Sequence, residues 1–224
     1  MKTLFIEARY DNKIKLPDAV IAQLSKNYDK VALFTTVQFL DSLPALKKQL
    51  EDKNVIVELL KPLHCKYEGQ LLGCSISNFR TDADAFLYIG DGMFHPIALK
   101  LYNLAGNKPV FAYNPFTKKL AEITENDTKK MQLQQKAALV KFHSSKEIGI
   151  LVSTKPGQNN MKKAHDLERK YPDKKFYLLL FDTLDFAQLE NFNFIECFVN
   201  TACPRISYDD SEKFAKKVVD VNLL

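Results

Sequence analysis

The sequence predicts an α/β protein made of two small parallel-sheet domains with flanking helices. Short apolar segments recur along the chain, and several of them, such as residues 85–89 and 110–113, are apolar throughout. Strands of this kind are typical of parallel sheets that are covered on both faces. Helix-like stretches stand between most of these segments. Repeated strand–helix–strand order therefore favours a parallel α/β fold.

The expected elements follow from the apolar segments and from helix signals. Strands are expected over residues 4–8, 31–36, 55–59, 85–89, 110–113, 148–153, 176–181 and 194–200. Helices are expected over 17–25 and 42–51, because each has a proline in its first turn. A further helix is expected over 96–105, since Gly106 follows it as a stop signal.

The longest stretch without a strand candidate, residues 122–142, predicts the connection between the two domains. Thr124 or Asp127 can cap a polar helix that continues through 129–142. Strand candidates both precede and follow this helix. We therefore expect one domain over residues 1–125 and a second over 126–224.

Composition and charge exclude several classes of protein. The 224 residues are 46% hydrophobic and 26% charged, which excludes a disordered chain. No apolar run is long enough to span a membrane, and the N-terminus has no secretory-signal pattern, so we expect a cytoplasmic protein. The net charge of +5 is spread over scattered lysine pairs rather than a basic stripe, so neither nucleic acid nor membrane is an expected partner. An acidic protein partner remains open.

Loops that follow the predicted strands hold most of the chain's scarce glycines. The chain has only 7 glycines, and most of them fall beside strand ends. Ligands of α/β proteins bind at the carboxyl ends of parallel strands. The sequence therefore predicts a site built from the loops 67–75, 88–96, 153–158 and 200–205, in the cleft between the two domains.

The 4 cysteines allow different interpretations. Cys197 lies inside a predicted strand and is expected to be a buried thiol. Cys74 and Cys203 lie in loops, where each is either a ligand or a thiol without function; Arg205 beside Cys203 would favour its thiolate. Cys65 follows His64, and this pair is either part of a metal site or an exposed loop pair. The spacings fit no zinc pattern and no closely spaced iron–sulfur motif, so a shared metal would need distant loops.

The loop 88–96 resembles a phosphate-binding loop only in part. Its Gly90-x-Gly92 start is followed by His95 where a dinucleotide fingerprint has a third glycine. His95 either caps the next helix or contacts a ligand. Asp91 either stabilises a turn or acts as an acid or base. The loop alone does not decide between these roles.

Taken together, the loops resemble one known family. The matching segments, in chain order, are YEGQLLGCS, FLYIGDGMFHP, YNPF, ILVSTKPGQ and FVNTACPRI. They are similar to motifs of the enzyme of the first step of diphthamide biosynthesis. The opening FIEARYD resembles the start of that family's second domain. The resemblance covers nearly the whole chain.

The resemblance implies a cofactor and a reaction. Family members have three similar α/β domains, and each domain supplies one cysteine to a 4Fe–4S cluster. S-adenosylmethionine binds the open iron and is cleaved to a 3-amino-3-carboxypropyl radical. This radical adds to a histidine of translation elongation factor 2. Matched motif by motif, Cys74 and Cys203 correspond to the second and third cluster ligands.

The family's first domain has no counterpart in this sequence, which leaves the third thiolate to be supplied. Met1 matches the natural start of the second domain, so the resemblance implies a separately encoded protein of two domains. Three sources are open: a separate protein that carries the first domain, a larger homologue in a heterodimer, or Cys65. The first two make the chain part of a hetero-oligomer.

S-adenosylmethionine requires polar groups for its carboxylate, amine and ribose. Arg205 is the expected carboxylate partner, because a guanidinium can donate two parallel hydrogen bonds to a carboxylate. Gln158, His95 and Asp91 lie in the neighbouring motif loops and are candidates for the remaining groups.

The expected function is therefore that of a radical 3-amino-3-carboxypropyltransferase acting with a partner. Two alternatives stay open. One is a non-catalytic subunit that supports a catalytic homologue. The other is a nucleotide-binding α/β protein without a metal, in which Cys74 and Cys203 have no reason to converge.

Overall fold

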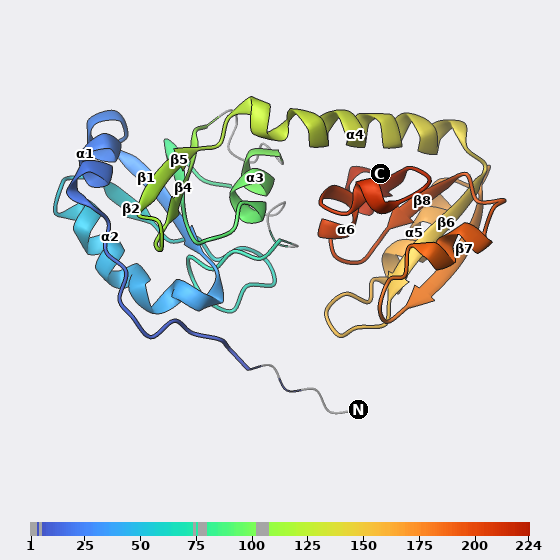
Figure 1. Cartoon of the computed structure of the whole chain (residues 1–224), viewed down its shortest axis with the longest axis horizontal. Helices are drawn as coiled ribbons and strands as arrows, with labels where there is room; N and C mark the ends of the chain where they lie inside the picture. Colours follow the sequence, from blue (N-terminus) through green and yellow to red (C-terminus); the bar gives the residue numbers. More distant parts are fainter. Residues whose placement is uncertain (1–3, 5, 74, 76–79, 102–107) are drawn as a thin grey trace. The chain divides into compact units, whose positions relative to one another are not determined.

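The structure is a computed structural model of the chain and describes residues 4, 6–73, 75, 80–101 and 108–224. The chain divides into two compact units, Met1–Thr128 and Lys129–Leu224. Each unit contains one sheet that is mainly or wholly parallel (Figure 1). The predicted α/β fold with two parallel sheets and flanking helices is confirmed.

The sheet of the first unit has the strand order β2-β1-β3-β4-β5. Its parallel strands are β1 (Lys30–Thr35), β2 (Ile56–Glu58), β3 (Ala85–Ile89) and β4 (Val110–Asn114). The edge strand β5 (Lys119–Glu122) pairs antiparallel with β4. The carboxyl ends of β1, β3 and β4 therefore lie along one edge of the sheet.

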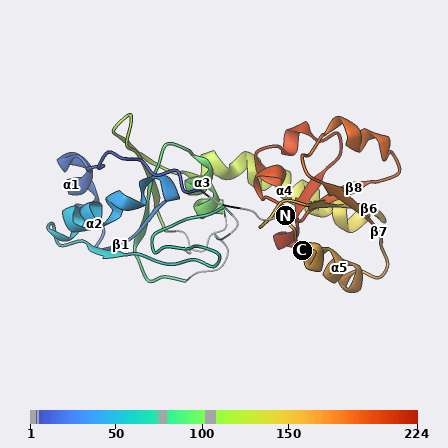
Figure 2. The ribbon, with the colours of Figure 1, turned by 90° about the horizontal axis from the view of Figure 1, so that it is seen from below.

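Successive side chains of β1 and β3 point to opposite faces of this sheet. Leu33 and its partner Leu87 face a core formed with α1 (Asp18–Asn27), the 3-10 helix η1 (Val37–Ser42) and α2 (Leu43–Glu51). Phe34 and its partner Tyr88 face the opposite core, which includes α3 (Phe94–Leu101). Figure 2 shows α1, α2 and α3 around the strands. Both faces are covered, which explains why these strands are apolar throughout.

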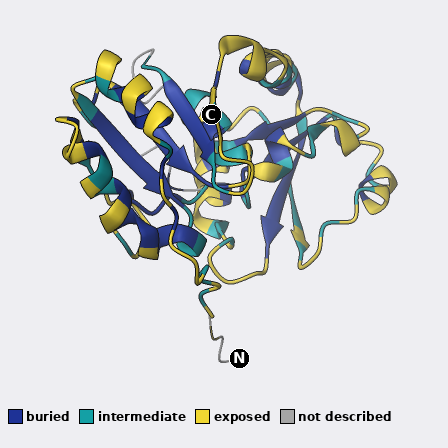
Figure 3. Cartoon of the chain, turned by 60° about the vertical axis from the view of Figure 1, so that its left-hand side comes forward, coloured by how far each residue is buried: buried dark blue, intermediate teal, exposed yellow. Residues whose placement is uncertain are grey.

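The second unit has a wholly parallel sheet with the strand order β7-β6-β8-β9. Its strands are β6 (Glu147–Ser153), β7 (Lys175–Phe181), β8 (Cys197–Asn200) and β9 (Val218–Asp220). One face packs against α4 (Glu125–Ser144) and α5 (Met161–Lys170), and the other against η2 (Ala187–Asn191). The short helices α6 (Arg205–Tyr208), η3 (Ser211–Lys213) and η4 (Val221–Leu223) complete the unit. Figure 3 shows the buried strands between exposed helix faces.

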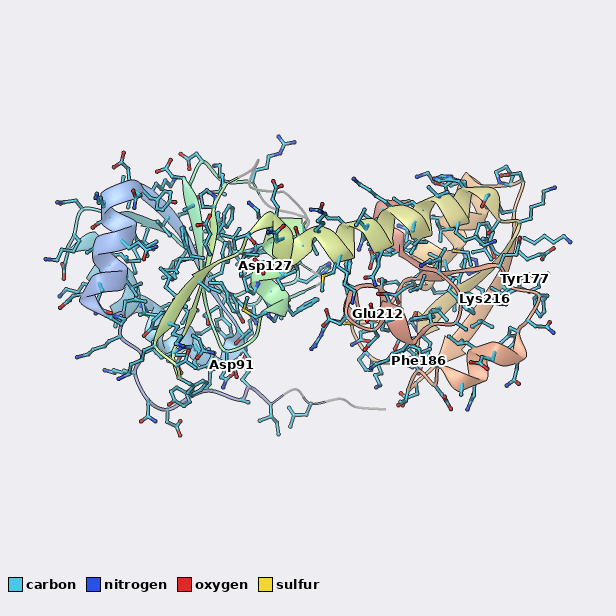
Figure 4. The ribbon with its side chains drawn as sticks, turned by 45° about the horizontal axis from the view of Figure 1, so that its top comes forward. Asp91, Asp127, Tyr177, Phe186, Glu212 and Lys216 are labelled. Atoms are coloured by element: carbon cyan, nitrogen blue, oxygen red, sulfur yellow. The ribbon has the colours of Figure 1, made fainter. Side chains whose placement is uncertain are left out.

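The long helix α4 begins where the sequence places its capping residues. The Asp127 carboxylate (Figure 4) accepts hydrogen bonds from the Thr124 backbone N–H and the Thr124 hydroxyl, both at 2.7 Å. These two bonds lower the pKa of Asp127. A carboxylate that reaches back to the residue before the first turn is half of a capping box. The helix begins at Glu125, directly after Thr124, one of the two predicted capping residues.

Some predicted elements differ from the observed ones. Leu4 and residues 6–8 form no strand, and Leu4 and Ile6 are 83% and 86% exposed. The edge strands of the first sheet are β2 and β5, and the described part of this segment pairs with neither. The strand predicted over 194–200 begins only at Cys197. Just before it the chain turns, and the Ile195 N–H donates to the Phe192 carbonyl at 3.1 Å. Lys216 Nζ donates to the carbonyls of Phe192, Asn193 and Ile195 in the same turn.

The sequence analysis also missed two strands, β5 and β9. Both strands are short. β5 lies at the edge of its sheet and is mostly exposed, so its ends are polar. β9 has only two apolar residues, Val218 and Val219. The end of α3 predicted at Gly106 lies outside the described residues. None of the described helices is both long and apolar enough to cross a membrane.

Candidate functional site

The loop that follows β8 carries Cys203 and is held by buried polar side chains. Asn200 ends β8 and is fully buried. Its Nδ2 donates to the Cys203 carbonyl at 2.9 Å, and its Oδ1 accepts from the Ala202 N–H at 3.0 Å. Cys203 itself is half-buried, and Pro204 starts the turn into α6. The parallel sheet thus presents this cysteine at its carboxyl edge.

A neighbouring loop, 153–160, is joined to the same edge of the sheet. Thr201 donates from its N–H and its hydroxyl to the Leu151 carbonyl, at 3.1 and 2.8 Å. The Asn160 side chain donates to the Thr201 carbonyl at 2.6 Å. Gln158, two residues earlier, is half-buried and closes a turn with Lys155. The structure therefore brings the loops of Gln158 and Cys203 together.

Arg205 lies in the first turn of α6 and is exposed. Its Nε donates to the Asp209 carboxylate at 2.7 Å, one helical turn further on. This ion pair occupies one side of the guanidinium. A carboxylate ligand would therefore bind beside Asp209 or displace it.

In the first unit, the loop before Cys74 is fixed to the end of β1. The Gly69 carbonyl accepts from the Thr35 N–H, and the Leu71 N–H donates to the Thr35 carbonyl, both at 2.8 Å. Gly69 has a φ of +70°, and a Cβ there would lie 2.5 Å from Leu43 Cδ1. Only glycine meets both conditions without strain. The glycine predicted beside a strand end therefore has a defined structural role.

Cys74 lies outside the described residues, but both of its chain neighbours are described. A Cβ on Gly73 would lie 2.5 Å from the Phe94 ring, so this backbone passes close to the start of α3. The Ser75 hydroxyl accepts from the Leu72 N–H at 3.1 Å and donates to the Leu72 carbonyl at 2.8 Å. The chain is therefore anchored on both sides of Cys74.

Asp91 lies in the loop between β3 and α3, and His95 lies in the first turn of α3. His95 is half-buried and stacks on Tyr88, with ring centroids 5.6 Å apart, and its Nδ1 lies 3.4 Å from the Tyr88 hydroxyl. Burial, with a smaller effect from the Asp91 charge, raises the pKa of Tyr88. Asp91 is exposed at the start of the loop (Figure 4). Stacking on Tyr88 therefore orients the His95 ring.

The other two cysteines are buried. Cys197 is fully buried in the core beneath α4 and α5, and burial raises its pKa to about 12. This confirms the expected buried thiol. Cys65 is 7% exposed, and its Sγ donates to the Ser75 hydroxyl at 3.3 Å. The alternative of an exposed pair is therefore wrong for Cys65, although His64 is exposed.

Burial also raises the pKa of the Cys65 thiol, and this effect outweighs its bond to Ser75. Within the described part of the chain, which leaves out Cys74, no three His, Cys, Asp or Glu side chains are grouped as a metal site. Of the described cysteines, Cys203 is the most accessible and therefore fits a metal ligand best.

A polar residue that sequence reasoning missed lies behind the Cys203 loop. Asp220 ends β9 and is 1% exposed. Burial raises its pKa, while hydrogen bonds from Asn222 and Ser207 act in the opposite direction. The available signal was an acidic residue directly after two valines, which is unusual at the end of a buried strand.

Comparison with known proteins identifies the family. The model of the diphthamide synthesis protein family matches residues 1–222. The chain belongs to this family. A 2-(3-amino-3-carboxypropyl)histidine synthase of Pyrococcus horikoshii is 30% identical over 202 residues, which cover 89% of this chain and 57% of the relative. The family resemblance inferred from the motifs is confirmed.

Further relatives and a solved structure agree with this. Subunit 1 of the human 2-(3-amino-3-carboxypropyl)histidine synthase is 29% identical over 192 residues. The alignment covers 84% of this chain and 42% of the human protein. The crystal structure of Dph2 from Pyrococcus horikoshii with a 4Fe–4S cluster aligns with a TM-score of 0.78 at 28% identity. The alignment covers 91% of this chain and 59% of Dph2. The chain thus spans about half the length of the curated relatives it matches.

Proposed function

We propose that this chain forms part of a 2-(3-amino-3-carboxypropyl)histidine synthase, with its two units corresponding to the family's second and third domains. The observation that supports this most strongly is the Cys203 loop, in a chain whose family includes a structure with a 4Fe–4S cluster. Cys203 is a half-buried thiol at the carboxyl edge of a parallel sheet, and its backbone is held by a buried asparagine. An iron–sulfur ligand needs an accessible thiolate in a fixed position.

Cys74 and Cys203 are the thiolates that this chain would supply to the cluster. When bound and reduced, such a cluster would hold S-adenosylmethionine and supply one electron for its cleavage. Arg205 and Gln158 lie in or beside the loops joined by Thr201, and would bind the carboxylate and amine of that cosubstrate. His95, from the first turn of α3, and Asp91, from the loop after β3, would contribute further polar contacts. The product is a 3-amino-3-carboxypropyl group on a histidine of translation elongation factor 2 in the cytoplasm.

The third thiolate is proposed to come from a polypeptide outside this sequence. Cys65 is a poor substitute, because it is buried, its pKa is raised, and its thiol is bound to Ser75. A separate protein with the first domain, or a larger homologue, would complete the set. Relatives named as subunit 1 of this synthase support an enzyme of more than one subunit.

Anaerobic reconstitution with iron and sulfide tests this proposal. The chain is mixed with the protein that carries the first domain, and iron, sulfide and visible absorption are measured. We expect about four irons per assembly, lost in Cys74→Ala and in Cys203→Ala. The matched control is Cys65→Ala, which should keep its iron. Unchanged iron binding in the Cys74 and Cys203 variants would contradict the proposal.

A supporting, non-catalytic subunit is the second candidate. It is favoured by relatives that are named as one subunit of this synthase. Product formation on elongation factor 2 separates the two functions. If Cys74→Ala and Cys203→Ala abolish iron binding by this chain but leave activity of the assembly intact, the chain is the supporting subunit.

A further inference from the structure

Behind the Cys203 loop, a line of hydrogen bonds connects three buried polar side chains. Asn200, Ser207 and Asp220 come from β8, α6 and β9, and none is more than 1% exposed. Asn200 Nδ2 donates to Ser207 Oγ at 2.8 Å, and the Ser207 hydroxyl donates to the Asp220 carboxylate at 3.3 Å. Buried polar groups are costly unless they are fully bonded, so a line of three needs an explanation beyond packing.

The hydrogen bonds of this line have one fixed direction. The other Asp220 oxygen accepts from the Asn222 N–H at 2.9 Å and from the Asn222 side chain at 2.8 Å. The Ser207 hydroxyl donates a hydrogen bond to Asp220 Oδ2, which accepts it as a carboxylate oxygen does. Ser207 Oγ is then left with lone pairs only and must accept from an N–H of Asn200. The orientation of the Asn200 amide is therefore set from Asp220.

With its orientation fixed, one side chain holds the backbone on both sides of the peptide bond between residues 202 and 203. Asn200 Oδ1 accepts from the Ala202 N–H, and Asn200 Nδ2 donates to the Cys203 carbonyl. Only an amide offers an acceptor and two donors at this place; aspartate has no donor. Asn200 thus ties Ala202 and Cys203 to the end of β8, next to the bonds that join Thr201 to Leu151.

We propose that Asn200 is a positioning residue for Cys203, and that Ser207 and Asp220 orient Asn200. The role of Cys203 as a cluster ligand rests on the proposed function, whereas its position in the loop does not. A thiolate held in place before metal binding loses less entropy when it becomes a ligand, and groups around a ligand tune the cluster. Neither effect requires Asn200 to touch the iron.

The first test measures the reactivity of Cys203 in the full chain without iron. Native protein is treated with iodoacetamide, and the alkylation rate of Cys203 is followed by mass spectrometry. Asn200→Asp removes both donated bonds and keeps the shape, and Ser207→Ala breaks the line at its centre. We expect each variant to raise the alkylation rate of Cys203 about five-fold or more. Losing a buried hydrogen bond shifts the equilibrium between the closed and the open loop by about this factor, and only the open loop exposes the thiol fully.

A matched control separates positioning from a general loss of stability. Ser145→Ala removes another buried hydroxyl, which donates to the Lys141 carbonyl at 2.7 Å, just before β6. It should lower the unfolding midpoint but leave the Cys203 rate within about two-fold of wild type. If the buried variants do not fold, Asn222→Ala replaces them. It removes the side-chain bond to Asp220 from an exposed position and should also raise the Cys203 rate. Unchanged Cys203 rates in all folded variants overturn the proposal.

The second test uses the reconstituted assembly. Asn200→Asp should shift the electron paramagnetic resonance spectrum or the reduction potential of the cluster, and Ser145→Ala should not. The two proposals can fail separately. If wild type binds no iron but the Cys203 rates respond as expected, the proposed function fails and the positioning role stands. If iron binds through Cys203 but neither rates nor spectra respond, the positioning role fails alone.

Discussion

The described cysteines differ in how far their thiols are buried. Cys197 is surrounded by apolar side chains, and its pKa of about 12 keeps it a neutral thiol at physiological pH. Cys65 is buried beside Ser75, whereas Cys203 is half-buried in a loop. Thiolates bind iron and thiols do not, so burial alone separates the structural cysteines from the candidate ligand.

Replacing Cys197 by alanine should affect stability and not iron binding. The substitution removes a fully buried sulfur from the core between β8 and α4, so it should cost about 1 kcal/mol of unfolding free energy. Urea denaturation measures this cost, and reconstitution measures iron. Cys203→Ala is the opposite case, with a smaller stability loss and loss of iron. A folded Cys197→Ala protein that binds no iron would contradict this assignment.

Glu7 should make stability depend on pH in the acid range. Its carboxylate accepts from Lys66 Nζ at 2.9 Å, Arg9 Nη2 at 2.6 Å and the Tyr67 hydroxyl at 2.9 Å. These bonds, that of Lys66 first, lower the pKa of Glu7 from 4.5 to about 2. The folded state therefore binds this proton less tightly than the unfolded state. The stabilisation is complete above pH 4.5 and is lost as pH falls towards 2.

The measurement compares urea midpoints of wild type and Glu7→Gln from pH 7 to pH 3. Wild type should be the more stable above pH 5, and the difference should shrink at lower pH. Glu190→Gln, an exposed carboxylate of the second unit, is the control and should show no such convergence. A difference that stays constant down to pH 3 would exclude the Glu7 contacts as its source.

At the residue scale, sequence motifs identified candidate ligands but not the groups that hold them. Cys203 could be singled out because a loop position after an apolar strand is visible in the sequence. The roles of Ser207 and Asp220 could not, because they depend on β8, α6 and β9 meeting in three dimensions. Likewise the Arg205–Asp209 pair is a helix contact that appears only once α6 is known.

At the element scale, apolar runs predicted the buried strands well and the edge strands poorly. β3 was predicted with its observed bounds, Ala85–Ile89, because both of its faces are covered. β5 is an edge strand of only four residues, and its polar ends, Lys119 and Glu122, leave no apolar run that meets the same criterion. The described residues of the segment 4–8 show the converse: Leu4 and Ile6 are exposed, and Leu4 and residues 6–8 form no strand. Burial on both faces, rather than apolar content alone, decided which predictions were correct.

Gly69, in the loop that is bonded to the end of β1, gives a prediction at this scale. Gly69→Ala should destabilise the protein by about 1–3 kcal/mol, because it combines a positive φ with a Cβ contact of 2.5 Å to Leu43. Gly92→Ala is the matched control, since a Cβ there has nothing within 4 Å and φ is not positive. Thermal and urea unfolding measure both. Equal costs for the two variants would show that the Gly69 conformation is not strained by a side chain.

At the scale of the whole molecule, the two units contribute separate parts of the proposed site. The first unit carries Cys74 between anchored neighbours, and the second carries Cys203 on a loop fixed by Asn200. Each unit has its own sheet and its own cores. The proposed cluster therefore requires two thiolates from two units of this chain. Whether both come from the same copy of the chain is a question of assembly.

Mixing two inactive variants answers that question. Chains carrying Cys74→Ala and chains carrying Cys203→Ala are combined in equal amounts, unfolded, refolded together and reconstituted with the partner. If both thiolates come from one copy, every site lacks a ligand and iron stays at the level of either variant alone. If two copies exchange thiolates across a symmetric dimer, about a quarter of the sites regain both cysteines. We expect no recovery, because the family model matches residues 1–222 of one chain, so a single copy carries both Cys74 and Cys203.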